Sequence, residues 1–293
     1  MADKKEIDNE ISEMSTLSSL VRAYEEIASA RMKRTRDYVL ANRQFLSELN
    51  DVFEQVRISF ARQVNELAKK KGKPGAETMT FLAHNGKRVC VFLSANTGLY
   101  GEIVPSVFDL FIADVRGANN EVTIVGKQGL SIFLSEEPDR PYTYFDLPDN
   151  TVTSSDLDEI IKHIVQYESI HVYYGEFVNV IQQKPAMLTI SAEISLKEEG
   201  KGKKTFYIFE PSLENILMFF ETEIFASLFE QSVREGQLAK FASRVMAMDK
   251  ADVNIKNKLS ELKFEKLRIT HRIANRKQLN TMSTRWIWKG GNL

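Results

Sequence analysis

Hydrophobic positions near both ends of the chain recur at steps of three and four residues. Such steps place apolar side chains on one face of a helix and are typical of a coiled-coil seam. The C-terminal seam comprises Leu238, Phe241, Val245, Met248, Asp252, Ile255, Leu259, Leu262, Lys266, Ile269 and Ile273. The N-terminal seam comprises Ile7, Ile11, Met14, Leu17, Val21, Tyr24 and Ala28, then Leu49, Val52, Val56, Phe60, Val64 and Leu67.

Neither seam has a partner within its own segment. A long apolar stripe left in water would be an aggregation hazard, so we expect the two ends to pack on each other. Because the middle of the chain must return it to its start, we expect the two helices to run antiparallel. Asp252 and Lys266 on the C-terminal seam leave two interpretations open: they set the register of the pair, or the seam continues as a surface that faces other subunits.

Glycine and proline divide the chain into three parts. Residues 1–71 contain neither, residues 212–289 contain only Gly236, and all seven prolines fall between Pro74 and Pro211. Because these two residue types are the least favourable inside a helix, both ends are predicted to be long helices. We therefore expect an N-terminal coiled-coil helix over 1–75, a globular domain over 76–211 and a C-terminal coiled-coil helix over 212–293.

The middle part alternates strand-like and helix-like segments. Strands are predicted at RVCVFLSA, EVTIVG, SIHVYYGEFVNVI, AMLTISAEI and TFYIF, with KEEGKGKK as an exposed hairpin tip. Helices are predicted at EIVPSVFDLFIADVRG and at SSDLDEIIKHIVQY, the latter capped by Ser155 with Asp158 three residues on. VGKQG is interpreted as a turn that ends a strand, with no helix after it. The predicted fold class is therefore α/β, Rossmann-like, plus a long antiparallel α-helical coiled coil formed by the N- and C-terminal helices.

Composition and charge indicate a folded protein with basic ends. The 293 residues are 43% hydrophobic and 27% charged, with a formal net charge of −1, which argues against a dedicated nucleic-acid binder. Residues 231–293 hold 14 Lys and Arg against five Asp and Glu, whereas residues 76–230 hold 11 against 23. The basic helices therefore favour an anionic partner, although ordinary solvation of a helix face remains the alternative.

No sequence motif for chemistry is present. The chain lacks G-x-G-x-x-G, Walker A and G-x-S-x-G patterns, and no His or Cys pair has the spacing of a zinc site. Cys90 is the single cysteine and lies in an apolar run, so we expect no disulfide within the chain and a reducing compartment. We expect no catalytic residue, cofactor or metal, no signal or transit peptide and no membrane span.

Several segments resemble the γ subunit of F-type ATP synthases, in the right order along nearly the whole chain. FASRVMAMDKADVN resembles the family's segment with an Arg-Met-x-Ala-Met core, which Arg244, Met246, Ala247, Met248, Ala251 and Asn254 fit. YIFEPSLENIL resembles its Glu-Pro-Ser joint. IASARMKRTRDYV resembles the family's small-residue patch followed by a basic cluster, and LSANTGLYGEI resembles its Gly-Leu-Cys-Gly loop. Tyr100 replaces the Cys of that loop, and the tail STRWIWKGGNL departs from the family pattern.

This resemblance implies a non-catalytic central shaft in a rotary ATPase. Its implied partners are the α and β subunits of a hexamer, an ε-type subunit and a membrane rotor ring, at the cytoplasmic face of a bacterial inner membrane. It implies two sets of contact residues. The proposed partner contacts are Arg31, Met32, Lys33, Arg34, Arg244, Met248, Lys250, Trp286, Ile287 and Trp288, with the basic ones making transient ionic contacts. The proposed contact loop for the ring or ε-type subunit is Gly98, Leu99, Tyr100 and Gly101.

Two alternatives stay open at this point. The chain could be the shaft of an F-type-like ATPase that is not coupled to ion transport, which its partner genes would reveal. It could also be a free-standing coiled-coil scaffold, which predicts a stable homodimer rather than one copy per hexamer.

Overall fold

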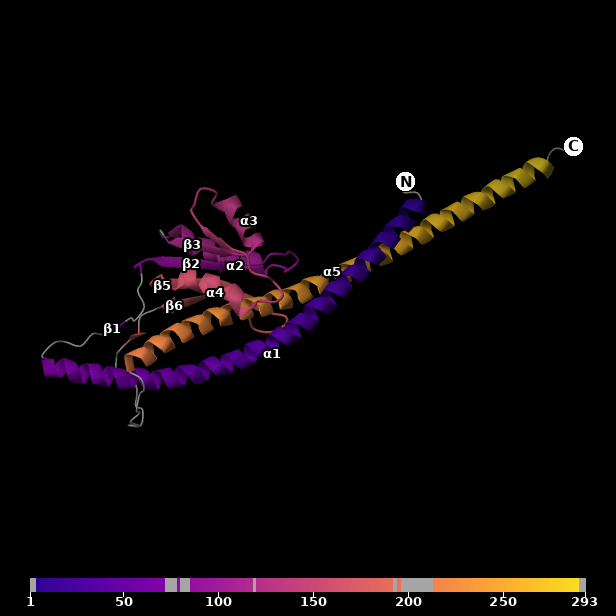
Figure 1. Ribbon diagram of the computed structural model, residues 1–293. Helices are drawn as coiled ribbons and strands as arrows, with labels where there is room; N and C mark the ends of the chain where they lie inside the picture. Colours follow the sequence, from indigo (N-terminus) through magenta and orange to yellow (C-terminus); the bar gives the residue numbers. More distant parts are fainter. Residues whose placement is uncertain are drawn as a thin grey trace. The chain divides into compact units, whose positions relative to one another are not determined.

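The computed structural model describes residues 4–71, 78–79, 85–117, 120–191, 194–195 and 213–289. The chain divides into two compact units (Figure 1). The helical unit consists of residues 1–28 and 245–293, and the sheet unit consists of residues 29–244. The predicted domain boundaries at residues 75 and 211 lie outside the described residues and stay predictions.

Two long helices, α1 (Lys4–Lys71) and α5 (Leu213–Lys289), occupy the ends of the chain as predicted. Within the helical unit they run antiparallel, because Asp8 pairs with Lys266 while Ser18 pairs with Asp252. Inside the sheet unit the two helices also contact each other, since Asn42 of α1 donates to Gln231 of α5 at 2.7 Å. The prediction of an α/β domain with an antiparallel pair of terminal helices is therefore confirmed.

The seam of α1 differs from the prediction at three positions. Leu17, Tyr24 and Val52 are 42%, 48% and 49% exposed, so their assignment to the seam was wrong. Positions at strict steps of four and three are buried or half-buried instead: Ile7, Ile11, Met14, Ser18, Val21, Glu25 and Ala28. The true register passes through polar residues because Ser18 hydrogen-bonds Asp252 across the pair. The predicted seam residues Phe60, Val64 and Leu67 have side chains outside the described residues.

The polar residues of the C-terminal seam are paired with α1. Asp252 is 6% exposed. Its carboxylate accepts hydrogen bonds from the Ser18 hydroxyl at 2.8 Å and from the Arg22 Nε at 3.3 Å. Lys256, one turn along α5, lies 2.6 Å from the same carboxylate. Beyond Lys266 the seam opens, and Ile273 is 52% exposed. The register interpretation therefore holds at Asp252, while the seam position Ile273 is open to solvent.

Acid should weaken the helical unit through Asp252. Hydrogen bonds from Lys256 and Ser18 lower the pKa of this carboxyl from 3.8 to about 2. Because the folded pKa is depressed, the stabilisation is complete above about pH 4 and is lost as the pH falls through about 2. We expect Asp252→Asn to lower the thermal unfolding midpoint near neutral pH, and the gap from the parent chain to close at low pH. Asp249→Asn, an exposed change on the same helix, is the control; an equal gap at all pH values would contradict the assignment.

A five-stranded mixed sheet forms the middle of the sheet unit, in the order β4-β3-β2-β5-β6. Strands β2, β3, β4 and β5 are parallel, and β6 is antiparallel to β5. The strands are β2 (Arg88–Leu93), β3 (Glu121–Val125), β4 (Thr143–Phe145), β5 (Ser169–Phe177) and β6 (Gln183–Ser191). A separate antiparallel pair joins β1 (Thr78–Met79) to β7 (Ile194–Ser195). The predicted strand TFYIF and the hairpin tip lie outside the described residues.

In the part of the chain that the structure describes, three shorter helices cover the sheet: α2 (Ile103–Gly117), α3 (Lys127–Glu136) and α4 (Ser154–Ile164). The interpretation of VGKQG as a turn without a following helix was wrong, because α3 begins directly after Gly126. That glycine has φ 102°, and a Cβ there would lie 2.9 Å from the Ala95 backbone. The cap of α4 was placed two residues late, since Thr153 and Asp156 form its capping box.

Alternation along the strands sends side chains to two cores. Ile170 and Val172 of β5 join the core beneath α4 and the first half of α5. Cys90 and Phe92 of β2 face the other way, into the core beneath α2, where Phe111 is fully buried. Both sheet faces are thus covered, which is the usual condition of a mainly parallel sheet.

Candidate functional site: a polar clamp between the 96–101 loop and α5

The loop at residues 96–101 connects β2 to α2 and contains two residues with positive φ. Leu99 has φ 69° and Gly101 has φ 58°. Glycine adopts this region freely, whereas a leucine there must be held by its surroundings. Leu99 is also 56% exposed, so the loop presents an apolar side chain to the outside while its backbone is held from within.

Asp149 holds the start of this loop. Its carboxylate accepts the backbone N–H groups of Asn96 at 3.0 Å and Thr97 at 2.8 Å, and the Thr97 hydroxyl at 2.8 Å. The side chain is only 4% exposed. A buried carboxylate that accepts several donors fixes a loop firmly, because each bond forms away from competing water.

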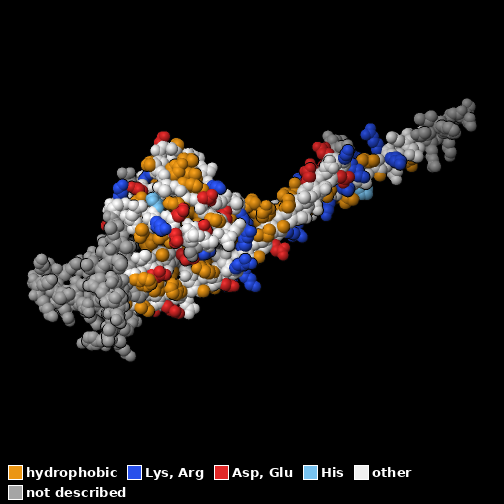
Figure 2. Space-filling view, in the orientation of Figure 1, with side chains coloured by type: hydrophobic (Ala, Val, Ile, Leu, Met, Phe, Trp, Pro, Cys, Tyr) orange, Lys and Arg blue, Asp and Glu red, His pale blue; other side chains and the backbone are white. Residues whose placement is uncertain are grey.

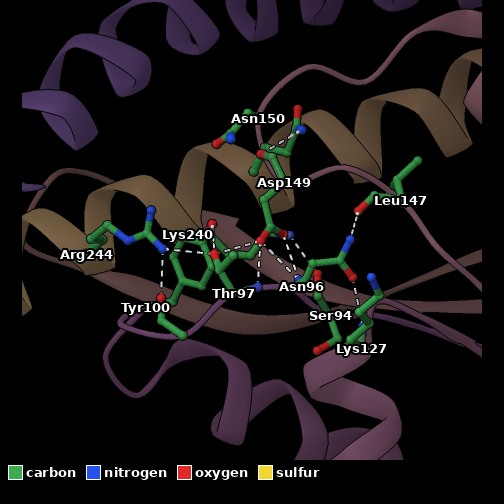
Figure 3. A network of polar contacts seen from close by, with 12 residues as sticks. Ser94, Asn96, Thr97, Tyr100, Lys127, Leu147, Asp149, Asn150, Lys240 and Arg244 are labelled. Atoms are coloured by element: carbon green, nitrogen blue, oxygen red, sulfur yellow. Dashed lines mark hydrogen bonds and ion pairs between the residues drawn. The ribbon is translucent and has the colours of Figure 1, made fainter.

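Helix α5 of the sheet unit closes on the same loop through two basic side chains (Figure 3). Lys240 donates to the Ser94 carbonyl at 2.6 Å and lies 3.6 Å from the Asp149 carboxylate. Arg244 donates to the Gly98 carbonyl at 2.7 Å. Its guanidinium carbon lies 3.8 Å from the centre of the Tyr100 ring, a cation–π contact. We call Thr97, Tyr100, Asp149, Lys240 and Arg244 the polar clamp.

The charges of the polar clamp depend on each other. Burial by itself would raise the pKa of Asp149, but the Lys240 charge and the bonds from Asn96 and Thr97 outweigh it, so the pKa is lowered. Burial lowers the pKa of Lys240, against the opposing pull of Asp149. Each buried charge therefore needs the other, as expected for an ion pair removed from water.

The polar clamp is suited to mechanical rather than chemical work. The Asp149 carboxylate, the Lys240 ammonium, the Arg244 guanidinium and the carbonyls of Ser94 and Gly98 are paired with one another. What the geometry achieves is a rigid connection of the 96–101 loop, and with it β2 and α2, to one turn of α5. The Ser243 hydroxyl adds a further bond to the Tyr100 carbonyl at 2.7 Å.

The structure differs from the sequence-based expectation at Arg244. We expected its side chain to make transient ionic contacts with a partner. Instead, Arg244 is 7% exposed, and its guanidinium donates to a carbonyl of the 96–101 loop. Asp149, Lys240 and Thr97 were missed altogether. They lie about fifty to 150 positions apart along the chain, and no local pattern distinguishes them from ordinary polar residues.

The other predicted contact residues are distributed over both units. In the sheet unit, Lys33 and Arg34 are exposed, Met32 packs against the core beneath α2, and Arg31 donates to Asn150. In the helical unit, Met248 is buried beside Val21 and Lys250 is exposed. Trp286, Ile287 and Trp288 belong to α5, but their side chains lie outside the described residues. Within the sheet unit the structure brings Gly98, Leu99 and Tyr100 of the loop together with Arg244.

Cys90 is not a nucleophile in this fold. Its side chain is fully buried, and burial, with the neighbouring Asp114 charge, raises the pKa of the thiol to about 11. A reactive cysteine needs a lowered pKa and some exposure. Among the described helices, none has a stretch long and apolar enough to cross a membrane.

Comparison with known proteins places this architecture in a family. A family model described as ATP synthase matches residues 3–269. The ATP synthase gamma chain of Desulforamulus reducens is 24% identical over 274 residues, covering 89% of this chain and 90% of that protein. The ATP synthase gamma chain of Staphylococcus epidermidis is 23% identical over 279 residues, covering 90% and 92%.

Two solved structures share the fold. A chain from the central stalk and c-ring structure of the Tetrahymena thermophila mitochondrial ATP synthase superposes with a TM-score of 0.54 at 19% identity, covering 79% of this chain and 99% of that one. A chain of the Euglena gracilis mitochondrial ATP synthase gives 0.55 at 13% identity, covering 90% and 96%. The chain therefore belongs to the ATP synthase gamma family, the family of the central rotor shaft of F-type ATP synthases.

Proposed function

We propose that this chain turns inside a hexamer of α and β subunits and that ATP chemistry takes place on those partners. In this proposal its lower part meets an ε-type subunit and a membrane rotor ring, at the cytoplasmic face of a bacterial inner membrane. The observation that carries the proposal is an apolar stripe in the helical unit that its own helix pair does not cover.

The stripe lies on α1, beside the seam rather than on it. Leu17, Leu20, Tyr24 and Ile27 follow steps of three and four, and they are 42–53% exposed. The seam meanwhile is closed by Val21, Met248 and Ile255. Figure 2 shows such hydrophobic side chains at the surface of the helix pair, among Lys and Arg side chains. A regular apolar stripe outside a closed seam is typical of a surface that another protein covers.

Charge on the same helices suits contacts that form and break. Lys33, Arg34 and Lys250 are exposed, and residues 231–293 hold 14 basic against five acidic side chains. Exposed ion pairs are worth only about 0–1 kcal/mol each, so acidic loops of a surrounding subunit can meet and leave such residues at little cost. We propose Arg31, Met32, Lys33, Arg34, Lys250, Trp286, Ile287 and Trp288 as the partner contacts, and Gly98, Leu99, Tyr100 and Gly101 as the loop that meets the ε-type subunit or ring. Met248 is left out because it is 6% exposed and closes the seam.

Rotation requires a stiff and asymmetric shaft. The closed seam resists separation of the two helices, and the polar clamp fixes the 96–101 loop to α5, so a torque applied to that loop passes into the helix. Because one pair of helices has no threefold symmetry, three surrounding catalytic subunits would each meet a different face of it. Turning the shaft would then carry each site through a different affinity for nucleotide.

Removing the apolar character of the stripe should weaken assembly. We expect Leu20→Gln and Ile27→Gln each to raise the dissociation constant for the α/β hexamer about tenfold, because burying such a side chain is worth about 1.5–3 kcal/mol. Ser19→Gln, an exposed change on another face of α1, should have little effect. Hexamer binding and ATPase rate are measured together, and circular dichroism checks the helix pair. Equal effects of all three variants would contradict the stripe as the contact.

Stoichiometry decides between the shaft and its alternatives. Native mass spectrometry of the complex purified from its source should give one copy of this chain with three α and three β subunits. A stable homodimer without these partners would favour the scaffold interpretation instead. Nucleotide affinity of the isolated chain would contradict a non-catalytic role.

A further inference from the structure

Three side chains with metal-binding atoms meet beneath α2, although they are far apart in the sequence. The parallel register of β2 and β5 places Cys90 directly beside His171. Alternation along the two strands sends both side chains to the face that α2 covers. Asp114, near the end of α2, reaches the same point. This cluster lies near the beginning of β2, whereas the polar clamp follows the strand's end, so the two are separate features.

The distances within this cluster match those between ligands of one ion. The Cys90 Sγ lies 3.8 Å from the Asp114 Oδ2, and the His171 Nδ1 lies 3.1 Å from the same oxygen. All three ligand atoms lie within 4.8 Å of one another. Zinc bonds of about 2.0–2.3 Å in a tetrahedron put neighbouring ligands roughly 3.3–3.7 Å apart. The two distances to the Asp114 oxygen lie on either side of this range.

The surroundings supply a second layer and an entrance. The Asn120 amide donates to the Cys90 Sγ at 3.4 Å, and Tyr173 donates its hydroxyl to Asp114. Donors of this kind orient ligands and stabilise a thiolate. Cys90 is fully buried and the His171 side chain is 12% exposed, but the Asp114 side chain is 36% exposed. An ion can therefore enter along Asp114, and water can take the fourth position.

The ligand set selects the class of ion. Sulfur and imidazole nitrogen favour zinc-like ions, whereas magnesium and calcium prefer oxygen alone. The arrangement does not suit nucleophilic catalysis, because thiol and imidazole each contact Asp114, and the described residues show no thiol–imidazole hydrogen bond. The competing interpretation is a cluster of hydrogen bonds that only satisfies the Asp114 carboxylate.

We propose that Cys90, Asp114 and His171 bind one Zn²⁺ ion, or another divalent ion of the same class, with water as the fourth ligand. On binding, the thiol releases its proton to solvent, and thiolate and carboxylate together balance the two positive charges around a neutral imidazole. The ion would connect α2 to the two central strands. The sequence gives no hint of this site, since its ligands come from three separate elements. The proposal does not depend on the rotary role.

Cobalt substitution tests the site directly, because Cys90 is the only cysteine of the chain. The full-length, untagged protein is stripped with chelator under reducing conditions and titrated with Co²⁺, then with Zn²⁺. We expect one equivalent of Co²⁺ to give ligand-field bands of a tetrahedral centre and a thiolate-to-cobalt charge-transfer band. Zn²⁺ should abolish both. Since no other thiolate exists in the chain, the charge-transfer band assigns the ion to Cys90.

Variants then separate binding from folding. Asp114→Asn and His171→Gln should each weaken Zn²⁺ affinity at least tenfold, because even the loss of a residue that only orients a ligand costs 10–100-fold. Cys90→Ser should remove the charge-transfer band, with circular dichroism confirming a folded chain. The control is His163→Gln, a half-buried histidine of α4 that bonds Thr123 at 3.2 Å and should leave affinity unchanged. Absence of the band at saturating Co²⁺ in the parent chain, or unchanged affinity in both Asp114→Asn and His171→Gln, would overturn the proposal.

Discussion

Asp149→Ala is expected to destabilise the sheet unit by about 3–5 kcal/mol, the usual cost of breaking a buried ion pair from one side. The change leaves the buried Lys240 ammonium without its counter-charge. It also removes the acceptor for the backbone N–H groups of Asn96 and Thr97. The loop should therefore loosen as the unit loses stability, which urea unfolding and hydrogen exchange at residues 96–101 would measure.

Two further variants make this expectation specific. Asp146→Ala removes a carboxylate only a few residues away that is half exposed. It pairs with the exposed Lys127 and accepts one bond from the Asn96 side chain but neutralises no buried charge, so its effect should be much smaller. Combining Asp149→Ala with Lys240→Met removes the unpaired buried charge and should recover part of the lost stability. If the double variant were no more stable than Asp149→Ala alone, the pairing of these two charges would not be the source of the loss.

Phe111→Ala is expected to cost a similar amount, about 3–5 kcal/mol, through a cavity beneath α2. The Phe111 ring is fully buried and stacks on Phe92 with ring centres 5.2 Å apart. It also meets Tyr173 edge-on at 5.5 Å and Phe133 at 6.2 Å. Because four rings pack around one another, the site can collapse only partly when one is removed. Denaturant unfolding of the full chain should show the loss as a lower midpoint.

The neighbouring residue on the same helix is the matched control. Leu110 is 38% exposed, so Leu110→Ala should lower the stability far less than Phe111→Ala. Both substitutions introduce alanine on the same helix, so the helix propensity of the new residue is the same. Similar losses for both variants would indicate that α2 does not pack as the structure has it. A stable Phe111→Ala variant would mean that the aromatic core is not what fastens α2 to the sheet.

Hydrophobic periodicity predicted both terminal helices. It predicted the buried seam residues more accurately on α5 than on α1. On α5, Met248, Ile255 and Leu262 are buried as expected, because α1 lies opposite them. On α1 the apolar positions form two neighbouring stripes, and the pattern alone could not say which one faces the partner helix. Ser18 rather than Leu17 occupies the seam, because Asp252 of α5 lies opposite this turn of α1 and its carboxylate needs a hydrogen-bond donor.

The turns and helix caps in the middle of the chain were predicted near their true positions, but two of them were assigned incorrectly. Gly126, which follows β3, was taken for part of a turn with no helix after it, whereas it is the N-cap of α3; a glycine with φ 102° is compatible with either. The cap of α4 was assigned to Ser155, while the chain uses Thr153, and both residues satisfy the same pattern of hydroxyl and acid three positions apart. In each case the local sequence pattern fits two solutions, and the sequence alone does not choose between them.

From its sequence alone, the chain is determined to have two long helices, an α/β middle, antiparallel ends and membership of a family of shafts. These properties depend on periodicity and on residues that lie near each other in the chain. Tertiary structure alone decided that Asp149 meets Lys240, that Arg244 turns inward to the 96–101 loop, and that Cys90, Asp114 and His171 converge. Single polar residues carry no periodic signal, so which of them become neighbours depends on strand register and helix packing.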